Sequence, residues 1–140
     1  MNNFEFYLDK KLVKRQSKDN ELAKSLIKDG VERVEKMKEL DINSFSKIIF
    51  ENIYDALRDL LDALLSVEGY KSYSHEATIS YLKNCGFEDS IIMQLDNFRY
   101  LRNSSKYYGK GISKDNADEI VNFYENYHEK LIKLIKSKIV

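Results

Sequence analysis

Residues 44–69, SFSKIIFENIYDALRDLLDALLSVEG, decide the fold of this chain. Their apolar side chains recur at helical spacing and form a stripe that is wide for a helix with a single neighbour. The stripe consists of Phe45, Ile48, Ile49, Ile53, Leu57, Leu60, Leu61, Leu64 and Leu65. Asn43 or Ser44 can cap the start of this helix, and Gly69 can end it in a left-handed conformation. We therefore expect a central helix covered on more than one side, by other helices or by a partner subunit.

Helical spacing continues on both sides of this segment. Before it, residues 1–18 form a basic arm or short helix, and residues 19–40 form a long helix in which Gly30 is a tolerated weak point. After it, we expect a short helix over 74–85, a helix over 90–107, and a final helix that Ser113 caps. No segment shows the alternation of a strand. The sequence therefore predicts one all-α domain over residues 1–140, a compact bundle of four to five antiparallel helices joined by short turns.

Composition limits the classes of function. The 23 basic and 23 acidic residues cancel, so any binding of a polyanion must come from a local patch. The single Cys85 cannot form an intrachain disulfide, and we expect it to pack against the core. No His, Asp and Glu cluster has metal-ligand spacing, so we expect neither a metal nor a cofactor. The N-terminus lacks a signal-peptide pattern and no apolar run has spanning length, which favours a cytoplasmic protein without membrane contact.

Residues 98–110, FRYLRNSSKYYGK, carry the most distinctive chemistry of the chain because they combine basic and aromatic side chains without an acid. Arginine offers a planar fork of donors to phosphate oxygens, and tyrosine rings can stack on bases. This pattern indicates a contact surface for a nucleotide or single-stranded RNA. The alternative is a solvated helix end in which Arg102 pairs with an acid of the central helix, such as Asp55 or Asp62, and the tyrosines cover the core.

Arg102 continues the line of Leu95 and Phe98 in steps of three and four residues, so we expect its side chain to turn toward the bundle. A buried guanidinium needs an acidic side chain, backbone carbonyls or an anionic ligand in a cleft. The central helix offers polar side chains nearby: Asp55, Arg58, Asp59 and Asp62.

The pair Arg102-Asn103 followed by Tyr107 resembles the Arg-Asn signature of HEPN domains (higher eukaryotes and prokaryotes nucleotide-binding), which are helical bundles of about this length. The resemblance extends to the order of helices, the long leucine-rich central helix and the GYKSYSH stretch at residues 69–75 that opens a short helix. It implies a HEPN-like bundle, a homodimer, and pairing with a minimal nucleotidyltransferase in a toxin–antitoxin-like arrangement.

Our first hypothesis is therefore a HEPN-like module that binds nucleotide or RNA through this segment. The expected contact residues are Arg99, Arg102, Asn103, Lys106, Tyr107 and Tyr108, with Asp55, Arg58 and His75 in support. Many HEPN proteins look like metal-independent ribonucleases that carry a His four to six residues after the Arg. Tyr107 stands at that position here, and a phenol with a pKa of about 10 is a poor general base at pH 7. Ribonuclease activity would need another proton-transfer group, and His75 qualifies only if it approaches Arg102 in space.

Two further hypotheses remain open at this stage. The broad leucine face of the central helix can serve a protein–protein interaction or dimerisation module, with the Arg-Asn segment merely closing the bundle. A second phosphate-binding patch can form if the basic N-terminal arm meets the lysines of the last helix. Those lysines are Lys130, Lys133, Lys136 and Lys138.

Overall fold

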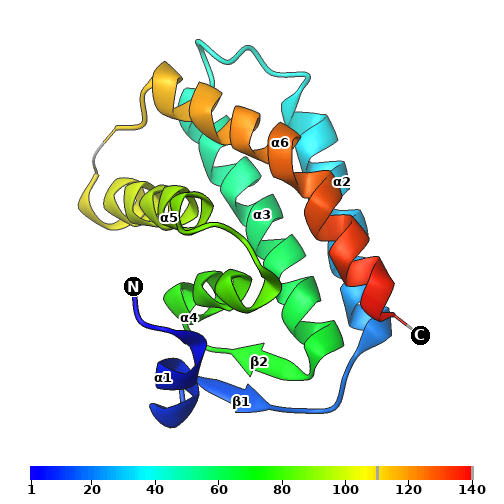
Figure 1. The fold of residues 1–140 in the computed structure, drawn as a ribbon. Helices are drawn as coiled ribbons and strands as arrows, with labels where there is room; N and C mark the ends of the chain where they lie inside the picture. The colour runs from blue at the N-terminus through cyan, green and yellow to red at the C-terminus, as the bar shows by residue number, and fades with distance from the viewer. Residues whose placement is uncertain (110, 140) are drawn as a thin grey trace.

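Residues 46–68 form the helix around which the other elements are assembled in the computed structural model (Figure 1). The structure describes residues 1–109 and 111–139, and the side chains of Tyr107 and Tyr108 are not among the described parts. Helices hold 74% of the residues, and the described part of the chain has only one small two-stranded sheet, which confirms the all-α class. None of the described helices is long and apolar enough to cross a membrane.

The elements follow one another along the chain with short connections. In order they are α1 (Phe4–Asp9), β1 (Val13–Arg15), α2 (Asn20–Met37), α3 (Ser46–Glu68), β2 (Tyr70–Ser72), α4 (His75–Ser80), the 3-10 helix η1 (Tyr81–Cys85), α5 (Asp89–Tyr108) and α6 (Lys114–Lys138).

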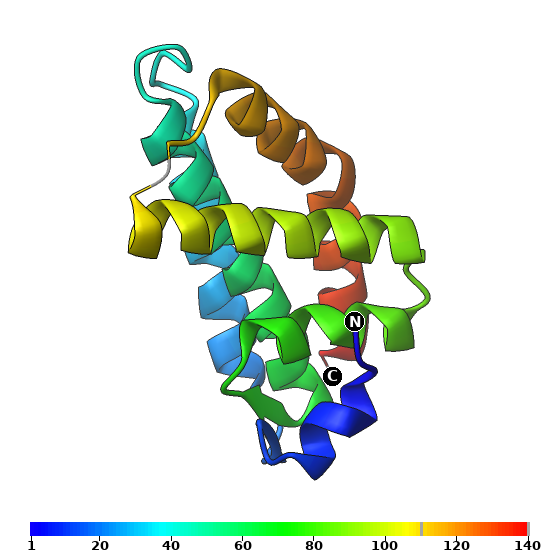
Figure 2. The same cartoon turned by 90° about the vertical axis from the view of Figure 1, so that its left-hand side faces the viewer.

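The leucines of α3 form the centre of the core. Leu57, Leu60, Leu61, Leu64 and Leu65 are each at most 2% exposed. The helices α2 and α6 pack along α3, and α5 crosses it (Figures 1 and 2). The leucines of the wide stripe are therefore covered by helices of the same chain, whereas Ile48 near the start of α3 is 48% exposed.

The arrangement of the helices differs from the expected antiparallel bundle. Only α2 runs antiparallel to α3, whereas α6 runs in the same direction as α3 because α5 lies between them in sequence (Figure 1). Figure 2 shows α5 lying across the middle of α3 rather than beside it. Amphipathic spacing predicts which face of a helix is buried, but it does not fix the angle at which two helices cross.

The start of α3 also differs from the prediction. Neither Asn43 nor Ser44 caps the helix; Phe45 occupies the N-cap position without a side-chain hydrogen bond. Ser44 belongs instead to a turn, in which its hydroxyl donates to the Asp41 carboxylate at 2.8 Å. As a result, Phe45 is 41% exposed and lies outside the buried stripe.

Several other helix ends follow the expected signals. Ser113 caps α6, and its side chain and that of Asn116 exchange hydrogen bonds with the backbone at 3.1 and 3.2 Å. Ser74 caps α4, and Gly69 ends α3 with a left-handed φ of 85°. The expected short helix over 74–85 changes at Tyr81 from an α-helix to a 3-10 helix.

Gly30 has a structural role that the sequence analysis missed. A Cβ at this position would lie 3.1 Å from the carbonyl oxygen of Ala56, so the glycine lets α2 and α3 approach closely. Gly30 is therefore a packing requirement of the α2–α3 interface rather than a tolerated weak point.

The expectation that the chain contains no strand is wrong. The arm over residues 1–18 folds into α1 and β1, and β1 pairs antiparallel with β2 in the register Val13↔Ser72, Lys14↔Lys71 and Arg15↔Tyr70. The Tyr73 N–H donates to Leu12 O at 2.8 Å and the Gln16 N–H to Gly69 O at 2.9 Å, which extends the ladder at both ends. Strands of three residues are too short to show alternation, and their pairing spans more than 50 residues of sequence.

Replacing Leu60 with alanine should test the role of α3. Leu60 is 0% exposed, so Leu60→Ala should lower the free energy of unfolding by about 2–5 kcal/mol through lost burial and the cavity that remains. Leu22 is 43% exposed, and Leu22→Ala should change it by only about 0.5 kcal/mol. Urea unfolding of both variants measures the difference, and equal losses would contradict the central position of α3.

Candidate functional site

The middle of α3 meets α5 and the start of α4 (Figure 2). Arg58 projects from α3, Arg99 and Arg102 from α5, and His75 opens α4. The charges of all three arginines act on the His75 imidazole. We call Arg58, Arg99, Arg102 and His75 the arginine cluster.

Arg102 turns toward the bundle, as its spacing predicts, and its side chain is only 12% exposed. Its Nη2 lies 3.1 Å from Asp55 Oδ1, and its Cζ lies 5.7 Å from the centroid of the Tyr54 ring. Its Nε is buried and has no hydrogen-bond partner in the part of the chain that the structure describes. The guanidinium is thus neither sealed from solvent nor fully matched by carboxylates.

Arg99 is matched by two acids. Its Nε lies 2.7 Å from Asp96 Oδ1, one turn earlier on α5, and its Nη1 lies 3.6 Å from Glu76 Oε1 on α4. The side chain is 17% exposed. These contacts fix α5 against the start of α4 and place two carboxylates beside this guanidinium.

Arg58 has no such match. It is half-buried in the middle of α3, and among the described residues no acid lies within 4.0 Å of it. Its charge reaches Asp62, one turn further along α3, where burial raises the pKa of the carboxyl while Arg58 and Lys71 oppose that shift. A half-buried guanidinium without an ion-pair partner is the feature of this cluster that an anion would complete.

His75 reports the positive potential of the cluster. Burial and, after it, the charges of Arg58, Arg102 and Arg99 together lower the pKa of its imidazole from 6.5 to about 4, with Asp55 opposing. The charge of Arg102 therefore acts on His75 across the contact between α5 and α4. The ring is neutral at pH 7.

The cluster suits the binding of an anion better than proton transfer. Guanidinium groups donate charge-assisted hydrogen bonds to phosphate oxygens, and a neutral imidazole can add one more hydrogen bond. In the free protein an imidazole with a pKa of about 4 is a weak base at pH 7. A bound anion would offset the arginine charges and raise the pKa of His75.

The structure places the remaining predicted site residues at different distances from this cluster. Asn103 is half-buried beside Arg102 in sequence, and Lys106 is exposed further along α5. Tyr107 and Tyr108, expected to contact the ligand, have side chains outside the described parts, and Lys110 is outside the described residues. The candidate site therefore contains residues of α3 and α4 as well as residues of the segment 98–110.

Within that segment the aromatic residues do not act together. Phe98 is fully buried in the core, where its ring lies 6.0 Å from that of Phe50, whereas Tyr100 is 59% exposed. Of the two aromatic side chains of this segment that the structure describes, one therefore belongs to the core and the other faces solvent.

Three residues of the site were missed at the level of sequence. They are Tyr54 under Arg102, and Asp96 and Glu76 around Arg99. The spacing of Asp96 three residues before Arg99 is a known ion-pair signal within a helix and was open to prediction. Glu76 reaches Arg99 from another helix, and no spacing rule indicates that contact.

The C-terminal lysines make contacts within the chain. Lys138 Nζ lies 2.8 Å from Glu68 Oε1 at the end of α3, and Lys130 Nζ lies 4.3 Å from the centroid of the Phe87 ring. Cys85 is half-buried against the core, as expected, and burial raises the pKa of its thiol.

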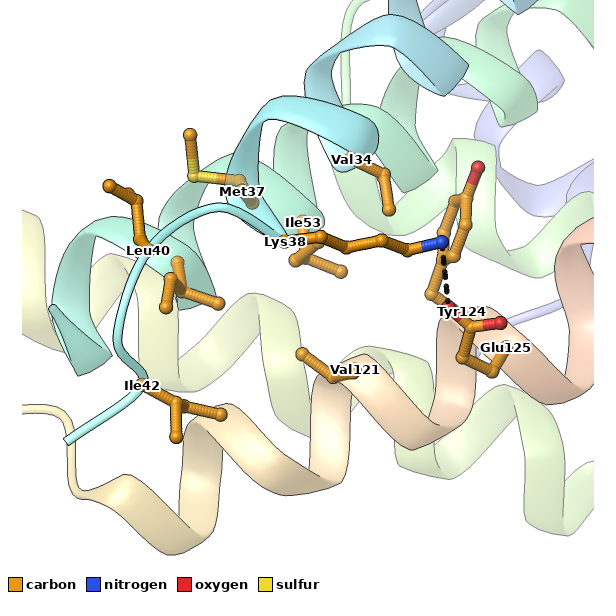
Figure 3. Close-up of a pocket in the computed structure, with 10 residues that line it drawn as sticks. Val34, Met37, Lys38, Leu40, Ile42, Ile53, Val121, Tyr124 and Glu125 are labelled. Atoms are coloured by element: carbon orange, nitrogen blue, oxygen red, sulfur yellow. Dashed lines mark ion pairs between the residues drawn. The ribbon is translucent and has the colours of Figure 1, made fainter.

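A separate apolar cavity of about 130 Å³ lies between α2, α3, α6 and the loop after α2 (Figure 3). Its walls are mostly aliphatic, including Val34, Ile53 and Val121. The polar groups at its edge are engaged, since Lys38 Nζ lies 3.7 Å from Glu125 Oε1 and 3.0 Å from Glu35 Oε1. The cavity therefore offers apolar contact but no convergent donors for chemistry.

Comparison with models of known protein families gives no match for this sequence, and comparison with curated proteins gives no relative either. Within the described part of the chain, no group of three or more His, Cys, Asp and Glu side chains is placed to hold a metal ion. The function must therefore be argued from the arginine cluster itself.

The pH dependence of stability should reveal the environment of His75. Because its pKa falls from 6.5 to about 4 on folding, the unfolded chain binds the proton more tightly, and His75 lowers stability as pH falls through this window. Asp59 acts in the opposite direction, because burial raises the pKa of its carboxyl to about 6. A comparison of the natural chain with a variant at His75 is not affected by this, since both proteins contain Asp59.

We expect His75→Gln to lose less stability than the natural chain between pH 7 and pH 4.5. The difference in the loss of unfolding free energy should be about 1–2 kcal/mol, after allowance for solvent screening of a half-buried ring. Urea unfolding at both pH values measures it. Identical losses in the two proteins would show that the ring has an ordinary pKa.

Proposed function

We propose that the arginine cluster binds a phosphate group of a nucleotide or of RNA, and that the chain is a HEPN-like binding module. The observation that carries this proposal is Arg58, a half-buried residue whose guanidinium has no ion-pair partner among the described residues and whose charge acts on His75 together with those of Arg99 and Arg102. Gathering like charges in a partly desolvated place costs free energy unless an anion offsets it. A phosphate matches both the charge and the forked geometry of these donors.

The arrangement assigns different tasks to the arginines. Arg58 is the primary donor, because its nitrogen atoms are not held by an acid of the described chain. Arg102 supports the ligand through the charge of its guanidinium, which is 12% exposed and held in place by Asp55. Arg99 orients the helix that carries Arg102.

The proposal does not include ribonuclease catalysis. A general base works best with a pKa near the working pH, and the pKa of His75 is about 4. Burial raises the pKa of Tyr54, whose ring lies under Arg102, to about 12. Neither group is suited to remove a proton at pH 7 in the free protein.

The HEPN resemblance is also what supports a homodimer and pairing with a minimal nucleotidyltransferase, and both belong to this proposal. The competing hypothesis of an interaction module loses its expected surface, since the leucines of α3 are buried within the chain. A protein partner would have to use another face.

Removing the charge of Arg58 should test the proposal. Arg58→Gln should weaken binding of adenosine monophosphate and of a short RNA oligomer at least tenfold, because a charge-assisted hydrogen bond contributes about 1.5–3 kcal/mol. Stability should change little, since no ion pair is broken. Isothermal calorimetry measures the affinity and urea unfolding the stability.

A matched control is Lys47→Gln, which removes one positive charge from an exposed position at the start of α3. It should bind both ligands as the natural chain does. Equal binding by Arg58→Gln and the natural chain would remove the proposed site. Arg102→Ala is a less selective test, since it also strips Asp55 of its partner and should destabilise the fold.

A further inference from the structure

The two-stranded ribbon carries an arrangement of charge that is unfavourable for the fold alone. Lys14 on β1 and Lys71 on β2 are direct partners in the antiparallel register. Like charges directly opposite each other destabilise a strand pair. Both side chains are exposed, so the ribbon presents two ammonium groups to solvent on one face.

An exposed aromatic ring lies between these lysines. Tyr73 follows Lys71 by two residues and is 58% exposed. Lys14 Nζ lies 5.8 Å from the centroid of its ring and Lys71 Nζ lies 5.9 Å from it. We call Lys14, Lys71 and Tyr73 the ribbon face.

The surroundings of the ribbon face are basic, and the contacts of Lys10 and Arg15 there are with aromatic side chains. The exposed basic residues of this region are Lys10, Lys11, Lys14, Arg15, Lys18 and Lys71. None of them makes an ion pair with an acid within 4.0 Å in the described part of the chain. The acids close in sequence are Asp9 on α1, Asp19, whose carboxylate caps α2, and Glu68, which pairs with Lys138 at 2.8 Å.

The ribbon is held firmly and continues into the arginine cluster. Tyr73 is fixed by its backbone hydrogen bond to Leu12, and it precedes His75 by two residues, a span of at most about 7 Å along the chain. Burial raises the pKa of the Asp62 carboxyl, and the charges of Arg58 and Lys71 both lower it. Figure 2 shows α5, α4 and the ribbon following one another along the same face of the molecule.

We propose that the ribbon face binds the nucleotides that adjoin a phosphate held by the arginine cluster, so that the ligand is single-stranded RNA several nucleotides long. This inference rests on the proposed function and extends it. The two ammonium groups contact backbone phosphates and offset their own repulsion, while a base stacks on the exposed Tyr73 ring. Single strands fit this role because their bases are free to leave the stack, whereas paired bases are not.

The test compares ligands of different length on the full chain. Adenosine monophosphate reports on the arginine cluster, and a single-stranded 12-nucleotide RNA reports on the cluster and the ribbon face together. Fluorescence anisotropy of labelled RNA, with competition by the nucleotide, gives both affinities for the natural chain, Tyr73→Ala, Tyr73→Phe and Lys14→Glu. Lys47→Glu is the charge-matched control, about 30 Å away along α3.

We expect the 12-nucleotide RNA to bind at least tenfold more tightly than adenosine monophosphate. Tyr73→Ala and Lys14→Glu should each weaken RNA binding about tenfold and leave binding of the nucleotide unchanged. Tyr73→Phe and Lys47→Glu should keep full affinity, because the first retains the stacking ring and the second lies outside the site. Lys14→Glu should keep or slightly raise the Tm, because it turns a like-charge pair into an opposite-charge pair.

The outcomes separate the two proposals. If the ribbon variants bind the 12-nucleotide RNA as the natural chain does, the lysines only protect the strand edge and the inference fails, while nucleotide binding lost in Arg58→Gln keeps the proposed function. If Arg58→Gln binds both ligands normally but the ribbon variants lose RNA, the arginine cluster fails and the ribbon remains an RNA site. Binding to phosphatidylserine vesicles in place of RNA, lost in Lys14→Glu, would assign the ribbon face to a membrane surface and overturn the inference.

Discussion

Burial of the apolar face of α3 is the constraint on which the rest of the structure depends. Its leucines are nearly free of solvent contact, and that burial supplies a large share of the free energy that offsets chain entropy. The helices α2 and α6 cover α3 along its length. The remaining part of its surface is therefore met by α5, which lies across α3, and by the start of α4 beside it. The polar side chains of α3 must emerge where these elements meet.

The polar side chains of α3 at this place form part of the charged site. Asp55, Arg58 and Asp62 follow one another on α3 in steps of three and four residues, so they share one face of the helix. The crossing of α5 adds two more arginines, and the acids nearby are largely engaged by them. Although the chain has no net charge, basic side chains without an acidic partner thus remain at Arg58 and, further along the same face of the molecule, on the ribbon.

The sequence predicted the parts of this fold that depend on local chemistry. The leucine stripe, the glycine that ends α3, the cap at Ser113 and the inward turn of Arg102 all follow from spacing or from the conformational preference of one residue. The ribbon could not be predicted, because three-residue strands carry no period and β1 finds its partner far along the chain. Gly30 was misread because only the neighbouring helix shows why a side chain has no room there.

The sequence predicted which residues form the candidate site, but not how its acidic and basic side chains pair. Arg102, Asp55, Arg58 and His75 were all named from the sequence, yet spacing alone cannot decide which arginine takes which acid. The crossing of α5 gives Asp55 to Arg102, and Asp96 and Glu76 to Arg99. Arg58 is left without an ion-pair partner among the described residues, and this result of three-dimensional packing is the basis of the proposed anion site.

The most direct test of the arginine cluster is an NMR titration that measures the pKa of the His75 imidazole. Its signal can be assigned by comparison with His75→Gln, because the chain has only two histidines. The account predicts a pKa of about 4 in the free protein and a higher pKa once adenosine monophosphate is present at saturation. A pKa close to 6.5 in the free protein, or one that does not move when the nucleotide is added, would contradict it.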